Sequence, residues 1–459
     1  MQTFDAIVIG SGQGGTPLAK KLAKAGFQTL LVEKRLVGGT CINDGCTPTK
    51  AMIASARRAH AVRHSGELGI LSGECRIDFE KIKERKNGIV SRFREAAQKG
   101  LENTPGLTLL MGEARFSGQR TVLVKTREGE ETFTAPHIFI NTGASPSIPR
   151  IPGLGSIPYY TSTTLLDIEN IPPHLFILGG SYIALELGQL FRRLGSQVTI
   201  IDKAPLFLHH EDRDVADALR QVLEAEGIKI YTQTEVLQIQ QETNGFSLKL
   251  KQDGKEQSLT GTHLLVATGR EPQTRALEPE KAGVATDEKG FIKVDDQLQT
   301  TAPGIYALGD VKGGPAFTHI AYNDHLIILK NVLQKGPASI KGRPVPYTMF
   351  TDPQLGRIGI TETDARKQGL NIEVVTLPMD KTARGIETGE TAGLMKAVVD
   401  ADTKQVLGAA ILAAEGGEVM SVLEMAMIGK IPCDEIREMI FAHPLYTESL
   451  NNLFMQLDQ

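Results

Sequence analysis

The feature that most constrains this 459-residue chain is a pattern that occurs twice, first at its N-terminus. A short apolar run at residues 4–9 reads as a buried strand and ends at the glycine-rich segment 10–15. A helical pattern follows, and a second apolar run at residues 29–32 ends at the acidic residue Glu33. Strand, glycine loop, helix, strand and acid in this order predict a βαβ unit that binds a dinucleotide.

The same pattern returns near the middle of the chain. Residues 175–178 predict a strand, 179–184 a glycine-containing turn, and 198–201 a second strand that ends at Asp202. A single glycine loop is weak support for a dinucleotide site, whereas two copies with strands, helix and acid in register are strong. The sequence therefore predicts two bound dinucleotides.

The predicted fold is α/β, with two Rossmann-like dinucleotide-binding domains and a C-terminal α+β dimerisation domain. Strands ending in Thr-Gly turns and followed by proline-rich segments, at 141–149 and 267–272, indicate that the chain leaves one domain and enters another. The boundaries that follow are a first domain at 1-148, a second at 149-271, a return to the first at 272-336, and a dimerisation domain at 337-459.

Composition excludes several classes of protein. A formal net charge of −4 argues against a nucleic-acid or membrane-surface partner. We find no apolar run long enough to span a membrane and no pattern of a signal peptide, so a cytoplasmic protein is expected. With 4 cysteines in 459 residues, the chain is not a disulfide-stapled secreted domain.

Two of these cysteines, Cys41 and Cys46, stand five positions apart, before a predicted helix in which Thr47 would be the N-cap and Pro48 the first helical residue. The positive end of a helix dipole lowers a thiol pKa and favours the thiolate. A redox-active pair is therefore favoured over a structural disulfide or two metal ligands, and no metal site is expected because no second Cys/His cluster follows.

Taken together, these motifs resemble the class I pyridine nucleotide–disulfide oxidoreductases, which include lipoamide dehydrogenase, glutathione reductase and mercuric reductase. The resemblance covers essentially the whole chain. Its motifs are the two glycine loops, the segment 38–50, both Thr-Gly turns, Gly309-Asp310, and His443-Pro444 with Glu448. The Cys-Thr-Pro-Thr-Lys segment and residues 317–321 are most similar to the mercuric-reductase-like branch.

The resemblance implies that the first loop holds FAD. Gly10 allows the tight turn, Gly12 the approach to the pyrophosphate and Gly15 the close helix–strand packing, while Glu33 bonds a ribose hydroxyl. Asp310 is the second flavin anchor. Further cofactor contacts are implied at Gly39, Thr40, Lys50, Thr142, Gly143, Gly269 and Ala321.

The second loop is implied to hold the nicotinamide cofactor, beginning at Gly179. It departs from the family pattern because Ser181 replaces a glycine, so the hydroxyl either weakens binding or donates to a phosphate. Asp202 accepts from a ribose 2′-OH and repels a 2′-phosphate, which favours NADH, although Lys203 and two nearby histidines leave NADPH possible. Tyr182 either covers the flavin until nicotinamide displaces it or is an ordinary packed tyrosine.

The catalytic roles also come from the resemblance. Cys46 faces the flavin and Cys41 exchanges with substrate, while Lys50, paired with Glu186, stabilises the reduced flavin. His443, oriented by Glu448, is the base for thiol exchange and serves the partner subunit, so a homodimer is implied. The two other cysteines, Cys75 and Cys433, are expected to be ordinary thiols.

The predicted activity passes electrons from NAD(P)H through FAD and the Cys41–Cys46 disulfide to a small disulfide, a metal ion or another acceptor. One alternative is lipoamide dehydrogenase running in the dithiol-oxidising direction, and another is a redox-sensing or complex-bound flavoprotein without useful turnover. An Hg(II) reductase is not expected because the last residues carry no cysteine pair. Asp44, between the cysteines, is expected to disfavour thiolate and make the dithiol a stronger reductant.

Overall fold

The computed structural model describes residues 1–334 and 336–458, and these form two compact units that are each built from separated stretches of chain. The first unit contains residues 1–51, 83–147 and 269–343. The second contains residues 52–82, 148–268 and 344–459.

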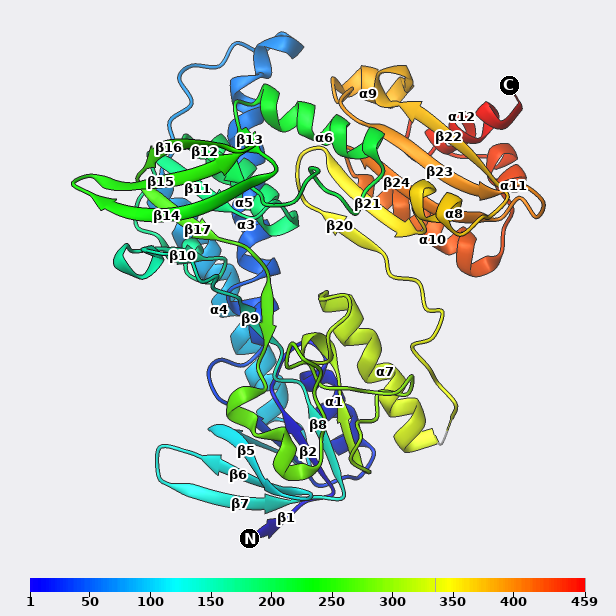
Figure 1. Ribbon diagram of the computed structural model, residues 1–459. Helices are drawn as coiled ribbons and strands as arrows, with labels where there is room; N and C mark the ends of the chain where they lie inside the picture. Colours follow the sequence, from blue (N-terminus) through cyan, green and yellow to red (C-terminus); the bar gives the residue numbers. More distant parts are fainter. Residues whose placement is uncertain (335, 459) are drawn as a thin grey trace. The chain divides into compact units, whose positions relative to one another are not determined.

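The first unit is built on a parallel five-stranded sheet in the order β19-β8-β2-β3-β4 (Figure 1). Its strands are β2 (Ala6–Ile9), β3 (Thr29–Glu33), β4 (Leu107–Met111), β8 (His137–Ile140) and β19 (Ile305–Ala307). Its helices are α1 (Gly15–Lys24), α2 (Gly39–Asn43) and α7 (Thr318–Gln334). The residues of α3 (Cys46–Arg63) and of α4 (Phe79–Glu102) are divided between the two units.

Both faces of this sheet are buried, which explains why β2 is apolar without alternation. Side chains such as Val8 and Phe139 face α1 and α7, while Ile7 and Ile138 pack against a second sheet, which is antiparallel except for the parallel pairing of β1 with β7. That sheet has the order β1-β7-β6-β5 and consists of β1 (Gln2–Thr3), β5 (Glu113–Gly118), β6 (Thr121–Lys125) and β7 (Glu130–Thr134).

The second unit repeats this arrangement. A parallel sheet in the order β10-β17-β11-β12-β13 has helices on one face and a three-stranded antiparallel sheet on the other. The parallel strands are β10 (Tyr160–Thr161), β11 (His174–Leu178), β12 (Gln197–Ile201), β13 (Lys229–Tyr231) and β17 (His263–Val266). The helices are α5 (Tyr182–Leu194) and α6 (Arg213–Ala225), and the covering strands are β14 (Thr234–Glu242), β15 (Gly245–Gln252) and β16 (Lys255–Gly261).

The rest of the second unit is an antiparallel sheet in the order β20-β21-β24-β23-β22, covered by helices (Figure 1). The strands are β20 (Tyr347–Met349), β21 (Gln354–Gly359), β22 (Ile372–Pro378), β23 (Leu394–Asp400) and β24 (Val406–Ala413). The helices are α8 (Glu362–Lys367), α9 (Ala383–Thr388), α10 (Gly416–Gly429), α11 (Cys433–Glu438) and α12 (Ser449–Phe454). The predicted α/β class, with two Rossmann-like parts and a C-terminal α+β part, is confirmed.

One local prediction needs correction. Helix α3 begins at Cys46, and the Thr49 N–H donates to the Gly45 carbonyl, so Thr47 lies inside the helix and is not its N-cap. Within the two proline-rich connections, β9 (Ala144–Pro146) and β18 (Arg270–Pro272) pair as an antiparallel ribbon. Among the described residues, no helix combines the length and apolar character that a membrane crossing requires.

A buried histidine on α7 gives the first unit a testable sensitivity to acid. The His325 side chain is fully buried, and burial, followed by the charge of Lys21, lowers its pKa to about 4. The ordinary pKa is about 6.5, so below that pH the unfolded chain binds a proton that the folded protein does not accept until about pH 4. Stability is therefore lost as the pH falls through this window.

We expect His325→Leu to gain stability relative to the parent as the pH falls from 7 to 4.5, by roughly 2–3 kcal/mol. Urea unfolding followed by circular dichroism at both pH values measures this difference. The exposed His64 is the matched control, since His64→Leu removes an imidazole without removing a buried one. An equal pH dependence for His325→Leu and the parent would show that the buried imidazole does not cause the effect.

Candidate functional site

The glycine loop that follows β2 is fixed by a side chain from the neighbouring strand end. The Gly15 N–H donates to Asn141 Oδ1 at 2.8 Å, and Asn141 Nδ2 donates to the Leu308 carbonyl at 3.0 Å. A Cβ atom at Gly15 would lie 2.0 Å from the Gly10 carbonyl oxygen, so no larger residue fits there. Asn141 thus joins the ends of three segments, a role that sequence reasoning missed although a polar residue directly after a buried strand was a usable signal.

Glu33 holds the same loop from the end of β3. It is 8% exposed, and its Oε2 accepts from the Ser11 N–H at 3.0 Å and from Ser11 Oγ at 2.6 Å. Its Oε1 accepts from the Arg35 N–H at 2.8 Å. A carboxylate has about four acceptor positions, so Glu33 can hold the loop and still accept from a ribose hydroxyl.

Three further groups nearby fit a bound dinucleotide. Thr142 Oγ1 is buried and has no hydrogen-bond partner among the described residues, so a polar atom is left for a ligand. Asp310 lies in a turn after β19, where burial raises its pKa although Arg270, 3.8 Å away, opposes this. Gly143 has φ of +73°, a conformation that favours glycine.

The two candidate redox cysteines come from adjacent helices of the first unit. Cys41 lies in α2 and Cys46 is the first residue of α3, and both are free thiols in this structure. The pKa of Cys41 is strongly raised, chiefly by a hydrogen bond with Cys46, then by burial and by the Cys46 charge; Thr318 and Lys50 act in the opposite direction. The Cys41 thiol therefore keeps its proton to a higher pH than an ordinary cysteine does.

Thr318, the first residue of α7, is a second participant that sequence reasoning did not single out. Its Oγ1 lies 3.5 Å from Cys46 Sγ. The N-terminal ends of α3 and α7 therefore meet at this sulfur, and both helix dipoles favour negative charge there. Ala321, predicted to contact the cofactor, lies one turn further along α7 and is buried.

The second glycine loop begins at Gly179, whose φ is +104°, and leads through Ser181 into α5. Tyr182 is the first residue of α5 and is half-buried. Glu186 is 3% exposed, and its Oε1 accepts from the Phe350 N–H at 2.8 Å. The expected need of this buried carboxylate for a partner is met in part by a backbone amide, while its pairing with Lys50 stays a prediction.

Asp202 follows β12 directly and faces the second loop. A Cβ atom at Gly180 would lie 2.4 Å from Asp202 Oδ2, so the carboxylate sits against the loop backbone. Lys203, which we considered as a phosphate-binding cation, instead pairs with Glu235 at 3.0 Å.

The predicted acid–base pair is formed near the C-terminus. His443 Nδ1 lies 2.9 Å from Glu448 Oε2 and 3.1 Å from Oε1, and the His443 side chain is 66% exposed. A carboxylate at Nδ1 orients the ring and leaves Nε2 directed away from it. The arrangement can take up a proton at an exposed position.

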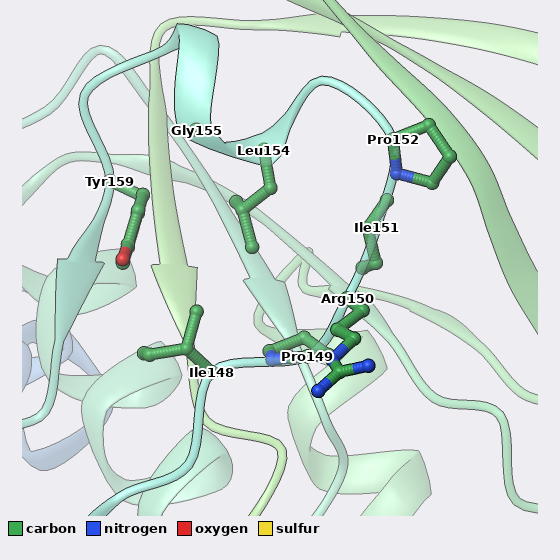
Figure 2. A pocket seen from close by; sticks show the side chains of 8 residues that line it. All are labelled: Ile148, Pro149, Arg150, Ile151, Pro152, Leu154, Gly155 and Tyr159. Carbon is green, nitrogen blue, oxygen red and sulfur yellow. The ribbon is translucent and has the colours of Figure 1, made fainter.

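A surface hollow of about 390 Å³ lies in the second unit and contains none of the predicted site residues. Figure 2 shows the side chains of Ile148, Leu154 and Tyr159 around it, with Arg150 at its edge. Among residues 1–334 and 336–458, no three His, Cys, Asp or Glu side chains gather as a metal site.

Comparisons with known proteins agree with this geometry. Residues 4–324 match the family described as pyridine nucleotide-disulphide oxidoreductase, and residues 345–454 match the dimerisation domain of that family. The chain is 38% identical over 458 residues to a probable pyridine nucleotide-disulfide oxidoreductase, RclA, of Escherichia coli, covering 99% of both chains.

Other relatives carry different activities. A dihydrolipoyl dehydrogenase of Thermus scotoductus is 35% identical, over 98% of this chain and 96% of that protein, and a mercuric reductase of Staphylococcus aureus is 32% identical, over 99% and 83%. A solved structure described as the Cu(II) complex of the HOCl-induced flavoprotein disulfide reductase RclA from Escherichia coli matches with a TM-score of 0.92 at 38% identity, covering 100% of both chains.

The Asn141 contacts predict a defined defect in FAD retention. Asn141→Ala removes the bond from the first glycine loop at Gly15 and the bond to the Leu308 carbonyl, so we expect the dissociation constant for FAD to rise about tenfold or more. Fluorescence titration of apoprotein with FAD measures this. Asn331→Ala is the matched control, because Asn331 also forms two amide bonds, to Ala338, at the other end of α7. Equal FAD affinity in the two variants would contradict the role of Asn141.

Proposed function

We propose, from the premise that this chain belongs to the FAD- and pyridine nucleotide-dependent family of pyridine nucleotide–disulphide oxidoreductases, that Cys41 and Cys46 carry its electrons to the acceptor. The observation that carries the proposal is the hydrogen-bonded thiol pair at the meeting point of two helix N-termini. A purely structural disulfide would not need one thiol that holds its proton and a second thiol on which helix dipoles favour negative charge.

Several of the residues proposed to hold FAD lie at the carboxyl ends of β2, β3, β8 and β19. Gly10, Gly12 and Gly15 would receive the pyrophosphate, Glu33 the ribose, and Asp310 the ribityl side. Thr142 supplies an unpaired hydroxyl, and Gly39, Thr40, Gly143, Gly269 and Ala321 complete the proposed set. When bound, FAD supplies two-electron transfer between nicotinamide and the disulfide.

The dithiol step needs two electrons and one proton. Reduction breaks the Cys41–Cys46 S–S bond, leaves Cys46 as thiolate, and places the proton on Cys41, whose pKa is raised. In the reverse half, the Cys41 thiol gives its proton to a base and its sulfur attacks a disulfide acceptor, so the acceptor S–S bond breaks and one acceptor thiol leaves with that proton. The Cys46 thiolate then attacks the Cys41 sulfur of the mixed disulfide, re-forms the Cys41–Cys46 bond and releases the second acceptor sulfur as thiolate. Lys50, whose charge is felt by Cys41, is proposed to stabilise negative charge, with Glu186 as its partner.

The proposed base is His443, with Glu448 orienting its ring. The dimerisation domain indicates a homodimer, and we propose that this tail serves the dithiol of the second copy. Support comes from the large apolar side chains exposed along α10 and the tail, which a partner would bury. They include Met425, Ile428, Met439, Ile440 and Leu445.

The acceptor is proposed to be a small disulfide or Cu(II). The relative from Escherichia coli is described as a Cu(II) complex, and soft sulfur ligands suit copper. With copper as substrate the balance is one dithiol and two Cu(II) giving one disulfide, two Cu(I) and the released protons. Oxidation of dihydrolipoamide is the second candidate, favoured by the dihydrolipoyl dehydrogenase relative.

The domain boundaries at 148, 271 and 336 are retained as a proposal, as is a cytoplasmic location. The two compact units do not follow these boundaries, because residues 52–82 belong with the second unit. The compact units are defined by contacts between residues, whereas the proposed boundaries divide the chain by function. The two divisions therefore differ at residues 52–82.

Replacing either redox cysteine should remove acceptor reduction. We expect Cys41→Ser and Cys46→Ser to lower NADH-dependent reduction of a disulfide or Cu(II) by at least a hundredfold while FAD remains bound. Steady-state NADH consumption with each acceptor measures this. Cys75→Ser is the control, because that thiol donates to the Ala59 carbonyl and is not one of the proposed site residues. Full activity in both redox-cysteine variants would overturn the dithiol route.

The cofactor preference should follow Asp202. Because Asp202 sits against the loop and Lys203 is paired with Glu235, we expect kcat/KM for NADH to exceed that for NADPH at least tenfold. Asp202→Asn should narrow that ratio by removing repulsion of the 2′-phosphate. A preference for NADPH in the parent enzyme would show that other residues set the choice.

A further inference from the structure

We propose that an ion pair between Arg35 and Asp44 sets the reduction potential of the Cys41–Cys46 dithiol. Asp44 lies between the two cysteines, and its Oδ2 is 2.6 Å from Arg35 Nη2. The inference rests on the proposed function, because it assigns a tuning role around a pair taken to be redox-active. It concerns two positioning residues, neither of which is expected to touch the acceptor.

Asp44 is held in place rather than free to turn toward solvent. Its side chain is 10% exposed, and its N–H donates to the Thr40 carbonyl at 3.0 Å. The preceding Asn43 donates to the carbonyls of Val37 at 3.0 Å and Gly39 at 2.9 Å. The carboxylate is therefore fixed at the end of α2, two residues before the Cys46 thiol.

The backbone of Arg35 is also held, on the cofactor side of the unit. Its N–H donates to Glu33 Oε1, which ties the backbone of Arg35 to the carboxylate that fixes the glycine loop. The Arg35 side chain is 51% exposed, so water screens part of its charge but does not remove it. The pair links the turn after β3 to the redox loop through one short ionic contact.

The two charges act on the dithiol with opposite signs. An unpaired carboxylate near Cys46 would disfavour thiolate and make the dithiol more reducing, which is the effect we expected of Asp44 from the sequence. With Arg35 beside it, most of the effect of the Asp44 carboxylate on the thiolate is cancelled. Removing Arg35 should expose the carboxylate, whereas removing Asp44 should leave an excess cation that favours thiolate.

Other groups around the thiols are constant in this comparison. The Lys50 charge and Thr318 act on Cys41 to lower its pKa, while Cys46 raises it. Arg94 reaches the same loop, donating to Asn43 Oδ1 at 3.3 Å. These groups are unchanged in the variants, so a comparison among the variants isolates the change at Arg35 and Asp44.

The test is a double-mutant cycle on the FAD-loaded protein. Arg35→Gln, Asp44→Asn and the double variant are equilibrated in dithiothreitol redox buffers at pH 7, and alkylation of Cys41 and Cys46 followed by mass spectrometry gives the fraction reduced. We expect Arg35→Gln to shift the thiol–disulfide equilibrium up to about tenfold toward disulfide, about 30 mV more negative. Asp44→Asn should shift it in the opposite direction, and the double variant should return close to the parent.

The opposite signs separate tuning from structure, because a loop damaged by either substitution would shift both single variants alike. Arg115→Gln, which breaks an ion pair with Glu130 elsewhere in the unit, is the control and should leave the equilibrium unchanged. Shifts of the same sign, or none, in both single variants would overturn the inference while leaving the dithiol route intact. Failure of the parent pair to form any disulfide would instead overturn the proposed function.

Discussion

The site in the first unit depends on one constraint, namely that the carboxyl ends of neighbouring parallel strands must be tied to one another. Asn141 does this with its amide, bonding the Gly15 N–H after β2 and the Leu308 carbonyl after β19. Glu33 does it from β3 by accepting both Ser11 donors. Because both side chains are buried, their hydrogen bonds are costly to lose, and the loops they hold are pre-arranged for a ligand.

Buried carboxylates that accept from backbone N–H groups recur in both units. Asp324, fully buried between Lys312 and Arg343, accepts from the Gly309 N–H at 2.9 Å and so fixes the turn that carries Asp310. Glu186 accepts from Phe350 in the second unit. Such bonds to an ionised acceptor are stronger than neutral ones, and they give irregular loops a fixed shape.

The sequence predicted most of the fold because both Rossmann-like parts have strong local signals. Continuous apolar strands, glycine turns and terminal acids are short-range features, and each was found where expected.

The roles of Asn141 and Thr318 were missed because they depend on contacts with residues more than a hundred positions away. The start of α3 was predicted too late in the chain because Thr47-Pro48 is a good capping signal. In the structure the Thr49 N–H donates to the Gly45 carbonyl, so the helix already begins at Cys46. Nothing in the sequence around Arg35 indicated its ion pair, because its partner Asp44 lies in the next loop.

The central claim is that electrons from the nicotinamide cofactor reach Cys41 and Cys46. The most direct measurement is anaerobic titration of oxidised, FAD-loaded protein with NADH, with protein thiols counted by alkylation and mass spectrometry at each step. The account predicts that two thiols, at Cys41 and Cys46, appear as reducing equivalents are added, with Cys75 and Cys433 unchanged. Reduction of the flavin without the appearance of these two thiols would contradict it.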